Sequence, residues 1–288
     1  MTTKISRPAY DPGDGSAERL AQIDADTLAE IDDLGEYPDS FGLTFSKALT
    51  TARVHALHDP TANAVESWEA WVAAMQTGSA LFAAVTAPEG STVECLIAHK
   101  PRTIPAIPPA HFSDAGTWLE AFWLAVICRD QNRMNQLTAV PVELLRASGA
   151  EFEEYIYPWV EAVQAYWMQR PELGEKLVAA FDGTSPDALR FVDRELMLKI
   201  LYPPLNVFYR FITGDEEKFS AALTQAVELH HEYWTADEER REDLDGAVAL
   251  APLALACLAH DAGMPITVES EYLPENLLDR SWVGEFPT

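Results

Sequence analysis

The stretch GAVALAPLALACLAHDAGMP, residues 246–265, decides the fold class of this chain. Apolar side chains lie on every side of the helix that it would form, and such a helix belongs in the centre of a protein core. Gly263 provides a left-handed C-cap, and Pro265 prevents the helix from continuing. The apolar part is shorter than the roughly 20 residues of a membrane span, and Pro252 and His260 interrupt or flank it. We therefore expect a buried central helix and no membrane partner.

Amphipathic helices are predicted on the N-terminal side of this core helix. A first helix begins at Ser16 and ends before Gly35, and a second covers about residues 40–57. The core-facing residues expected in the first helix are Leu20, Ile23, Leu28 and Ile31. From residue 63 onward, apolar residues recur at spacings of three, four and seven, which is typical of one helix face. These residues are Val65, Trp68, Val72, Met75 and Phe82.

Further helices are predicted over residues 118–128, 158–169 and 216–233, the last with Asp215 as its N-cap. Between them, residues 91–98 alternate in the manner of a short strand, and a proline-rich connector follows to about residue 110. This connector is the best candidate for a domain boundary. The fold class expected is all-α, a multi-helix antiparallel bundle or array with at most one or two short strands near residues 91–98. Residues 1–15 are expected to be a flexible lead-in, and residues 16–288 a single helical domain.

The charge of the chain excludes one large class of partner. It carries 46 Asp and Glu residues against 20 Lys and Arg, a net charge of −26. Nucleic acid is not expected as a partner, because phosphate binding needs a basic surface. No apolar segment follows the basic residues at the N-terminus, so we expect no signal peptide and a cytoplasmic protein. Cys95, Cys128 and Cys257 lie far apart among apolar neighbours, which favours reduced, buried thiols.

Patterns that could bind a metal are incomplete. His230-His231-Glu232 lacks the second histidine of a zincin, because Thr235 stands at that position. Glu228 and His231 have the spacing of a di-iron pair, but a second such pair is missing. Cys257 and His260 could supply two ligands, fewer than a zinc site requires. We expect structural roles for these residues and no bound metal.

One acidic motif offers an enzymatic alternative. Asp32, Asp33 and Glu36 have the spacing with which helical prenyl-diphosphate enzymes bind magnesium. The motif stands beside Gly35 and Pro38 at the end of a helix, and no second metal motif follows it. Nucleophile-elbow, Walker and dinucleotide fingerprints are missing as well. We therefore expect no enzyme, no catalytic residues and no cofactor.

The C-terminal half resembles a known family. The segment Ala254–Pro274 with Glu275–Leu278 is similar to the C-terminal signature of the immunity protein 49 family of bacterial polymorphic toxin systems. The segments Tyr202–Ile212, His230–Trp234 and Trp118–Asp130 resemble the same family, over about residues 60–282. The resemblance implies an all-helical protein that neutralises a cognate toxin. It names no contact residues.

The acidic clusters then become candidates for contact with that toxin. The candidate partner-binding residues are Asp237, Glu238, Glu239, Glu242, Asp243 and Asp245. Carboxylates of this density would speed the encounter with a basic protein, for example a nuclease whose substrate groove is occluded. A solvated surface without a partner gives the same pattern. A general helical scaffold for other partners is the third alternative.

Overall fold

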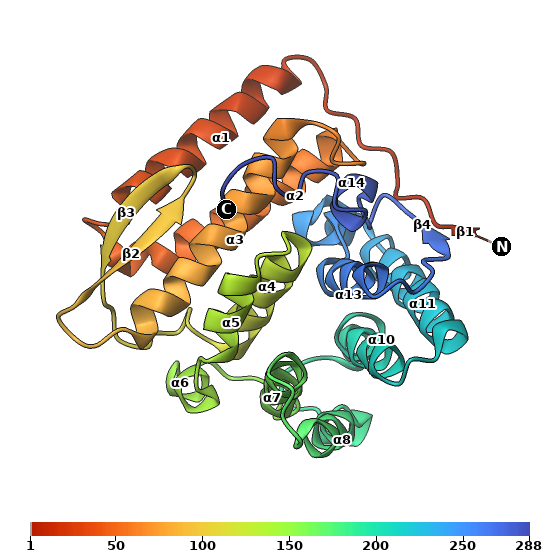
Figure 1. The fold of residues 1–288 in the computed structure, drawn as a ribbon. Helices are drawn as coiled ribbons and strands as arrows, with labels where there is room; N and C mark the ends of the chain where they lie inside the picture. Colours follow the sequence, from red (N-terminus) through yellow and green to blue (C-terminus); the bar gives the residue numbers. More distant parts are fainter. Residues whose placement is uncertain (1) are drawn as a thin grey trace. The chain divides into compact units, whose positions relative to one another are not determined.

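The computed structural model describes residues 2–288. It confirms the all-α class: helices hold 62% of the chain and strands 6% (Figure 1). The chain divides into two compact units. The first contains the residues up to Pro8 together with Glu151–Asp279, and the second contains Ala9–Ala150 with Arg280–Thr288. The division falls after Ala150 and not in the proline-rich connector. The lead-in and the single domain over residues 16–288 stay predictions.

The unit around Ala9–Ala150 contains a run of helices interrupted by one hairpin. Its elements are α1 (Ser16–Asp33), η1 (Pro38–Ser40), α2 (Phe41–His58), α3 (Val65–Thr86), β2 (Thr92–Ile97), β3 (Lys100–Pro105), α4 (Ala115–Ile127), α5 (Gln131–Thr138) and α6 (Val142–Ala147). Helices that follow one another along the chain pack together, α2 on α3 and α3 on α4. Strands β2 and β3 are antiparallel, so part of the expected connector is a second strand.

Large aromatic side chains form the core of this unit. Trp68, Trp71 and Trp118 are all less than 2% exposed. The Trp118 ring stacks on Phe122 at a centroid distance of 5.2 Å, and its indole N–H donates to the Leu137 carbonyl. The apolar face predicted for the helix after residue 63 is therefore confirmed, apart from Val65 at its exposed first position.

The stripe predicted for the first helix is only partly buried. Ile31 is 0% exposed, whereas Leu20 and Ile23 are half-buried and Leu28 is 43% exposed. Helix α1 packs against α2 along a narrow line, in which Thr27 and Ile31 are its buried residues. The prediction that all four apolar residues face a core is wrong, because the packing of α1 on α2 buries only Thr27 and Ile31 of this helix.

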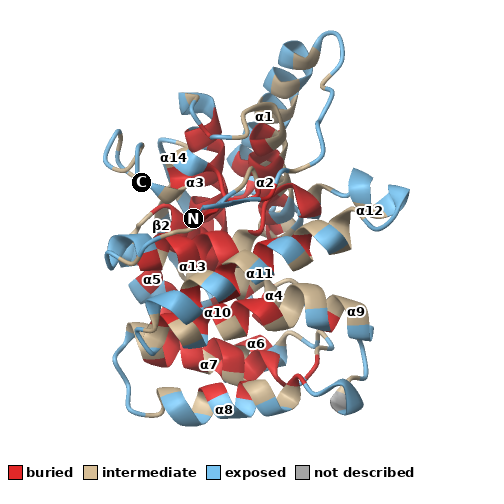
Figure 2. Ribbon diagram, turned by 90° about the vertical axis from the view of Figure 1, so that its right-hand side faces the viewer, coloured by how far each residue is buried: buried red, intermediate tan, exposed pale blue. Residues whose placement is uncertain are grey.

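The unit around Glu151–Asp279 is built on the predicted core helix. Its elements are β1 (Thr3–Lys4), α7 (Ile156–Trp167), α8 (Leu173–Gly183), η2 (Pro186–Ala188), α9 (Arg194–Leu196), η3 (Met197–Leu201), α10 (Tyr202–Ile212), α11 (Glu216–Trp234), α12 (Glu238–Glu242), η4 (Leu244–Ala247), α13 (Leu250–Asp261), β4 (Val268–Glu269) and α14 (Glu275–Leu278). Helix α13 is largely buried, as Figure 2 shows, and Gly263 follows it with a φ of 81°. Asp215 caps α11 as predicted. Strand β1 pairs in parallel with β4.

The stretch Leu244–Asp261 passes a length and composition test for a membrane span within the part of the chain that the structure describes, and 61% of it is buried inside the protein. The α-helical part, α13, has 12 residues. At 1.5 Å per residue it measures about 18 Å, against about 30 Å for a bilayer core. Burial and length both fit a core helix.

Two prolines shape the entry to α10. Pro203 and Pro204 stand in its first turn, directly after the π-helical turn Met197–Leu201. Proline lacks an N–H group, and its ring clashes with the carbonyl four residues earlier. The N–H of Tyr202 instead donates to Met197, five residues earlier. The wider turn lets one nearly continuous helix pass through the prolines.

Cys128 and Cys257 are buried thiols, as predicted, and Cys95 is half-buried. All three cysteines are free.

Candidate partner-binding surfaces

The acidic segment, Asp237–Asp245, is exposed but contains two residues with structural roles. Asp237 caps α12 by accepting the backbone N–H of Arg240 at 2.8 Å, and Asp243 caps η4 through the N–H of Asp245 at 2.9 Å. Glu238, Glu239 and Glu242 are exposed, and their side chains form no hydrogen bond or ion pair with the described chain. Of the six predicted contact residues, these three are therefore the ones most available to a partner.

A network of ion pairs holds the acidic segment on its unit. Arg240 Nη1 donates to Glu195 at 3.0 Å, and Lys199 lies 3.1 Å from the same carboxylate. The Arg240 guanidinium also lies 4.0 Å from the centre of the Tyr233 ring. The hydrogen bond from Arg240, followed by that from Lys199, lowers the pKa of Glu195. The segment is thus fixed by Arg240 while its glutamates are exposed.

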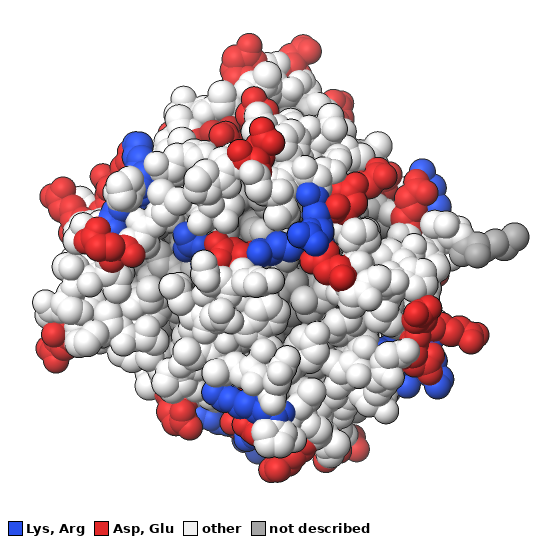
Figure 3. Space-filling view, viewed as in Figure 1, with Lys and Arg blue, Asp and Glu red and all other residues white. Residues whose placement is uncertain are grey.

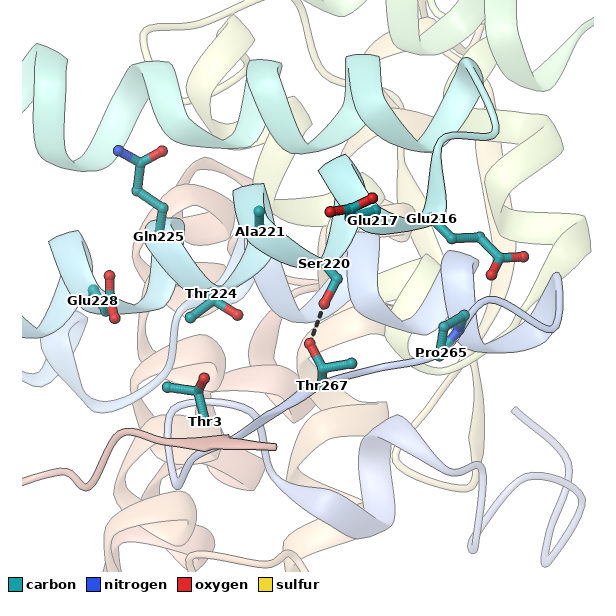
Figure 4. Close-up of a pocket in the computed structure, with 10 residues that line it drawn as sticks. All are labelled: Thr3, Glu216, Glu217, Ser220, Ala221, Thr224, Gln225, Glu228, Pro265 and Thr267. Carbon is teal, nitrogen blue, oxygen red and sulfur yellow. Dashed lines mark hydrogen bonds between the residues drawn. The ribbon is translucent and has the colours of Figure 1, made fainter. Parts of the chain in front are cut away.

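A second acidic surface follows one face of α11. Glu216, Ser220, Thr224 and Glu228 recur every four residues and line a shallow groove of about 660 Å³ (Figure 4). Thr3 and Thr267 form its opposite side, and Ser220 and Thr267 share a hydrogen bond across it. The groove presents hydroxyl, carboxylate and amide groups that a partner could contact.

The sequence analysis overlooked this groove. Its polar spacing of four was visible in the sequence, but the threonines that complete it come from the two ends of the unit.

Acidic side chains do not form one continuous patch on the face shown in Figure 3. There Asp and Glu lie in separate groups divided by neutral surface, several of them beside Lys or Arg. The net charge of −26 can still attract a basic partner from a distance. Specific recognition would have to come from individual groups of carboxylates.

The acidic motif of the enzymatic alternative is neutralised by the hairpin. Asp32 lies 2.7 Å from Arg102 Nη2 and 3.0 Å from Lys100 Nζ. The hydrogen bonds from Lys100 and Arg102 lower its pKa. Asp33 and Glu36 are exposed beside it. Over residues 2–288, no group of three or more His, Cys, Asp or Glu side chains is placed to hold a metal ion.

The histidines and the core cysteine have structural contacts. His230 is 6% exposed and hydrogen-bonds the Gly246 carbonyl at 3.1 Å, and His231 Nδ1 lies 3.1 Å from the Tyr272 hydroxyl. The Cys257 thiol contacts the Leu277 carbonyl at 3.8 Å, whereas His260 is largely exposed beside Asp261. These side chains tie α11 and α13 to the segments that follow them.

Comparison with protein families gives one match. The model of the family described as immunity protein 49 matches residues 59–277, which is most of the chain. The chain belongs to the immunity protein 49 family. Searches of curated proteins and of solved structures found no match. The family match begins after α2 and ends within α14, so α1, α2 and the C-terminal residues lie outside it. The resemblance seen in the sequence is thereby confirmed.

Proposed function

We propose that this protein neutralises a cognate toxin by binding it and covering its active or substrate-binding surface. Membership of the immunity protein 49 family, over residues 59–277, carries the proposal. The surfaces described above support it, because they offer exposed charged groups on a stable helical scaffold. Binding of this kind requires complementarity and no turnover, so the proposed protein is not an enzyme and acts without a cofactor.

The proposed encounter is electrostatic. A toxin with a basic surface, such as a nuclease, would be attracted by a protein with a net charge of −26. Attraction of this type raises association rates by roughly 10 to 1,000-fold at low salt. Glu238, Glu239 and Glu242 are proposed as contact residues because they are exposed and serve no structural role. The place of action proposed is the cytoplasm, where a toxin acting on nucleic acid would meet its target.

Co-expression tests the proposal. The toxin-like product of the neighbouring gene is expressed in a sensitive host with and without this protein, and survival and co-purification are both measured. We expect survival together with a stable complex. Growth arrest in both cultures, or survival without any complex, would contradict direct neutralisation. The triple variant Glu238→Gln, Glu239→Gln and Glu242→Gln tests the contact residues and is expected to slow association. Its matched control is the triple variant Glu89→Gln, Glu143→Gln and Glu175→Gln, which removes the same charge from exposed residues outside both candidate surfaces.

A further inference from the structure

A small pocket lies in the unit around Ala9–Ala150, among three helices that Figure 1 shows side by side. Ala48 and Thr51 of α2 form its floor, α1 and α3 form its walls, and the turn Ala98–His99 of the β2–β3 hairpin closes one end. Its volume is about 170 Å³. This is close to the roughly 150 Å³ cavity that holds a benzene-sized ligand, so the pocket has room for one side chain.

The walls of the pocket have an apolar surface that the fold leaves uncovered. Leu28 belongs to the stripe expected in the core, yet it is 43% exposed at this place. Ala48, Ala70 and Ala73 lie opposite, and their short side chains leave the space open. An aliphatic chain entering here would gain contact with all of these groups.

Three carboxylates line the pocket, and neither Lys nor Arg does. Asp24 comes from α1, while Glu66 and Glu69 come from α3. Asp24 Oδ1 lies 2.8 Å from His55 Nε2, and Glu69 Oε1 lies 3.4 Å from His99 Nε2. These carboxylates repel one another, and a cation in the pocket would relieve that repulsion.

Gln76 provides an independent sign of a ligand. Its side chain lines the pocket although the residue is 1% exposed. Its Oε1 accepts the backbone N–H of Ala98 at 2.8 Å, which fixes the orientation of the amide. The Nε2 group then has two N–H donors and no acceptor among the hydrogen bonds of residues 2–288. This group reaches the accessible space of the pocket, where it can donate to an acceptor that enters.

We propose that this pocket receives an arginine side chain of the toxin, with a neighbouring main-chain carbonyl accepting from Gln76. A polypeptide carries both groups, a cation and a neutral acceptor, within a few bonds of each other. The planar guanidinium has five donors and can serve carboxylates on both walls, and its aliphatic stem covers Leu28 and Ala73. The inference rests on the proposed neutralising function, and it adds the chemistry of one anchoring contact.

The pocket also joins two parts of the sequence. Asp24, Leu28 and Thr51 precede the family match, whereas Glu66, Gln76 and His99 lie within it. Five of the thirteen lining residues therefore come from the segment of this chain that precedes the family match.

Titration of the full-length protein with N-acetyl-arginine N-methylamide tests the pocket without the toxin. The neutral isostere N-acetyl-citrulline N-methylamide is the matched ligand control, and the Gln76 side-chain amide signal in NMR is the readout. We expect saturable shifts of that signal with a dissociation constant on the order of 1 mM. Citrulline binding should be at least tenfold weaker.

Protein variants locate the effect. Glu66 and Glu69 are exposed, so Glu66→Gln with Glu69→Gln should fold normally and bind the arginine ligand at least fivefold more weakly. Glu143→Gln with Glu175→Gln carries the same change in net charge at exposed residues outside the pocket, and it should bind as wild type does. Equal binding of arginine and citrulline, or an equal effect of both double variants, would overturn the inference.

The same variants separate this inference from the proposed function. If wild-type protein protects cells and the Glu66→Gln, Glu69→Gln variant captures the toxin with unchanged affinity, the pocket is not the anchor. If wild-type protein neither protects cells nor captures the toxin, the proposed function fails, whatever the arginine titration shows.

Discussion

Removal of the Glu153 carboxylate should free the loop that leads from α8 to α9. Glu153 is 4% exposed, and its Oε1 accepts three backbone N–H groups. The donors are Arg190 at 2.5 Å, Phe191 at 2.6 Å and Val192 at 3.1 Å. These bonds are the main link between the loop and the start of α7. In Glu153→Ala all three donors lose their acceptor at once.

The magnitude follows from the bonds that are lost. A hydrogen bond to a charged group contributes about 1.5–3 kcal/mol. Three of them would total more than 4 kcal/mol, but residues 190–192 are accessible enough to be hydrated once the loop opens. We therefore expect Glu153→Ala to cost about 3–4 kcal/mol. Glu153→Gln keeps an acceptor oxygen and should cost about 1–2 kcal/mol.

Hydrogen exchange and urea unfolding together measure this effect. We expect amide protection of residues 190–192 to fall strongly in Glu153→Ala and weakly in Glu153→Gln. Glu151→Gln is the matched control, because Glu151 is an exposed carboxylate two residues away. It should behave as wild type does.

Acid provides a second test of the same contact. Burial raises the pKa of Glu153, but the three backbone donors outweigh it and the pKa lies below its ordinary value of 4.5. The contribution to stability is therefore complete above pH 4.5 and is lost as pH falls through the lowered pKa. In Glu153→Gln, the urea midpoint should not show the fall in acid that protonation of Glu153 causes in the wild-type protein. Unchanged protection of residues 190–192 in Glu153→Ala, or equal losses for Ala and Gln, would refute the reasoning.

Three further predictions concern packing, charge and association. A Cβ atom at Gly78 would lie 2.6 Å from the Phe45 ring, which is too close without a shift of the ring. Gly78→Ala should therefore destabilise the protein by about 1–3 kcal/mol in urea unfolding. An unchanged urea midpoint would contradict this prediction. Asp130→Ala removes the carboxylate partner of the buried Arg133, 3.2 Å away, and should cost about 3 kcal/mol in urea unfolding. Asp130→Asn loses the same charge but keeps the capping oxygen, so it should cost less, and equal costs for the two variants would contradict a contribution of the cap. Stopped-flow association with a basic toxin should slow by at least tenfold between low and high salt, and a constant rate would rule out electrostatic attraction.

Local patterns in the sequence determined the helices of this protein. The apolar residues of 246–265 specify a buried helix wherever that segment lies, because its backbone hydrogen bonds close within the segment itself. Asp215 is an N-cap for the same reason, since its partner is three residues away. The family could also be recognised from the sequence, because its signature consists of such core and capping residues.

The roles of individual acidic residues were decided only by the tertiary structure. Glu151 and Glu153 look alike in the sequence, yet one is exposed and the other accepts three N–H groups from residues 37–39 positions away. Asp32 meets two bases about 70 positions further along. The sequence around a carboxylate contains no periodic signal that would identify a partner so far away along the chain.

The pocket beside Leu28 belongs to the same class of feature. The spacing of apolar residues in the first helix predicted which of them share a face, but it could not show that packing on α2 would bury only Thr27 and Ile31 of α1. The orientation of the Gln76 amide is likewise fixed by Ala98, which the hairpin turn places beside it. Periodicity sets which residues share a helix face, whereas the neighbouring elements set whether that face is buried or left open for a partner.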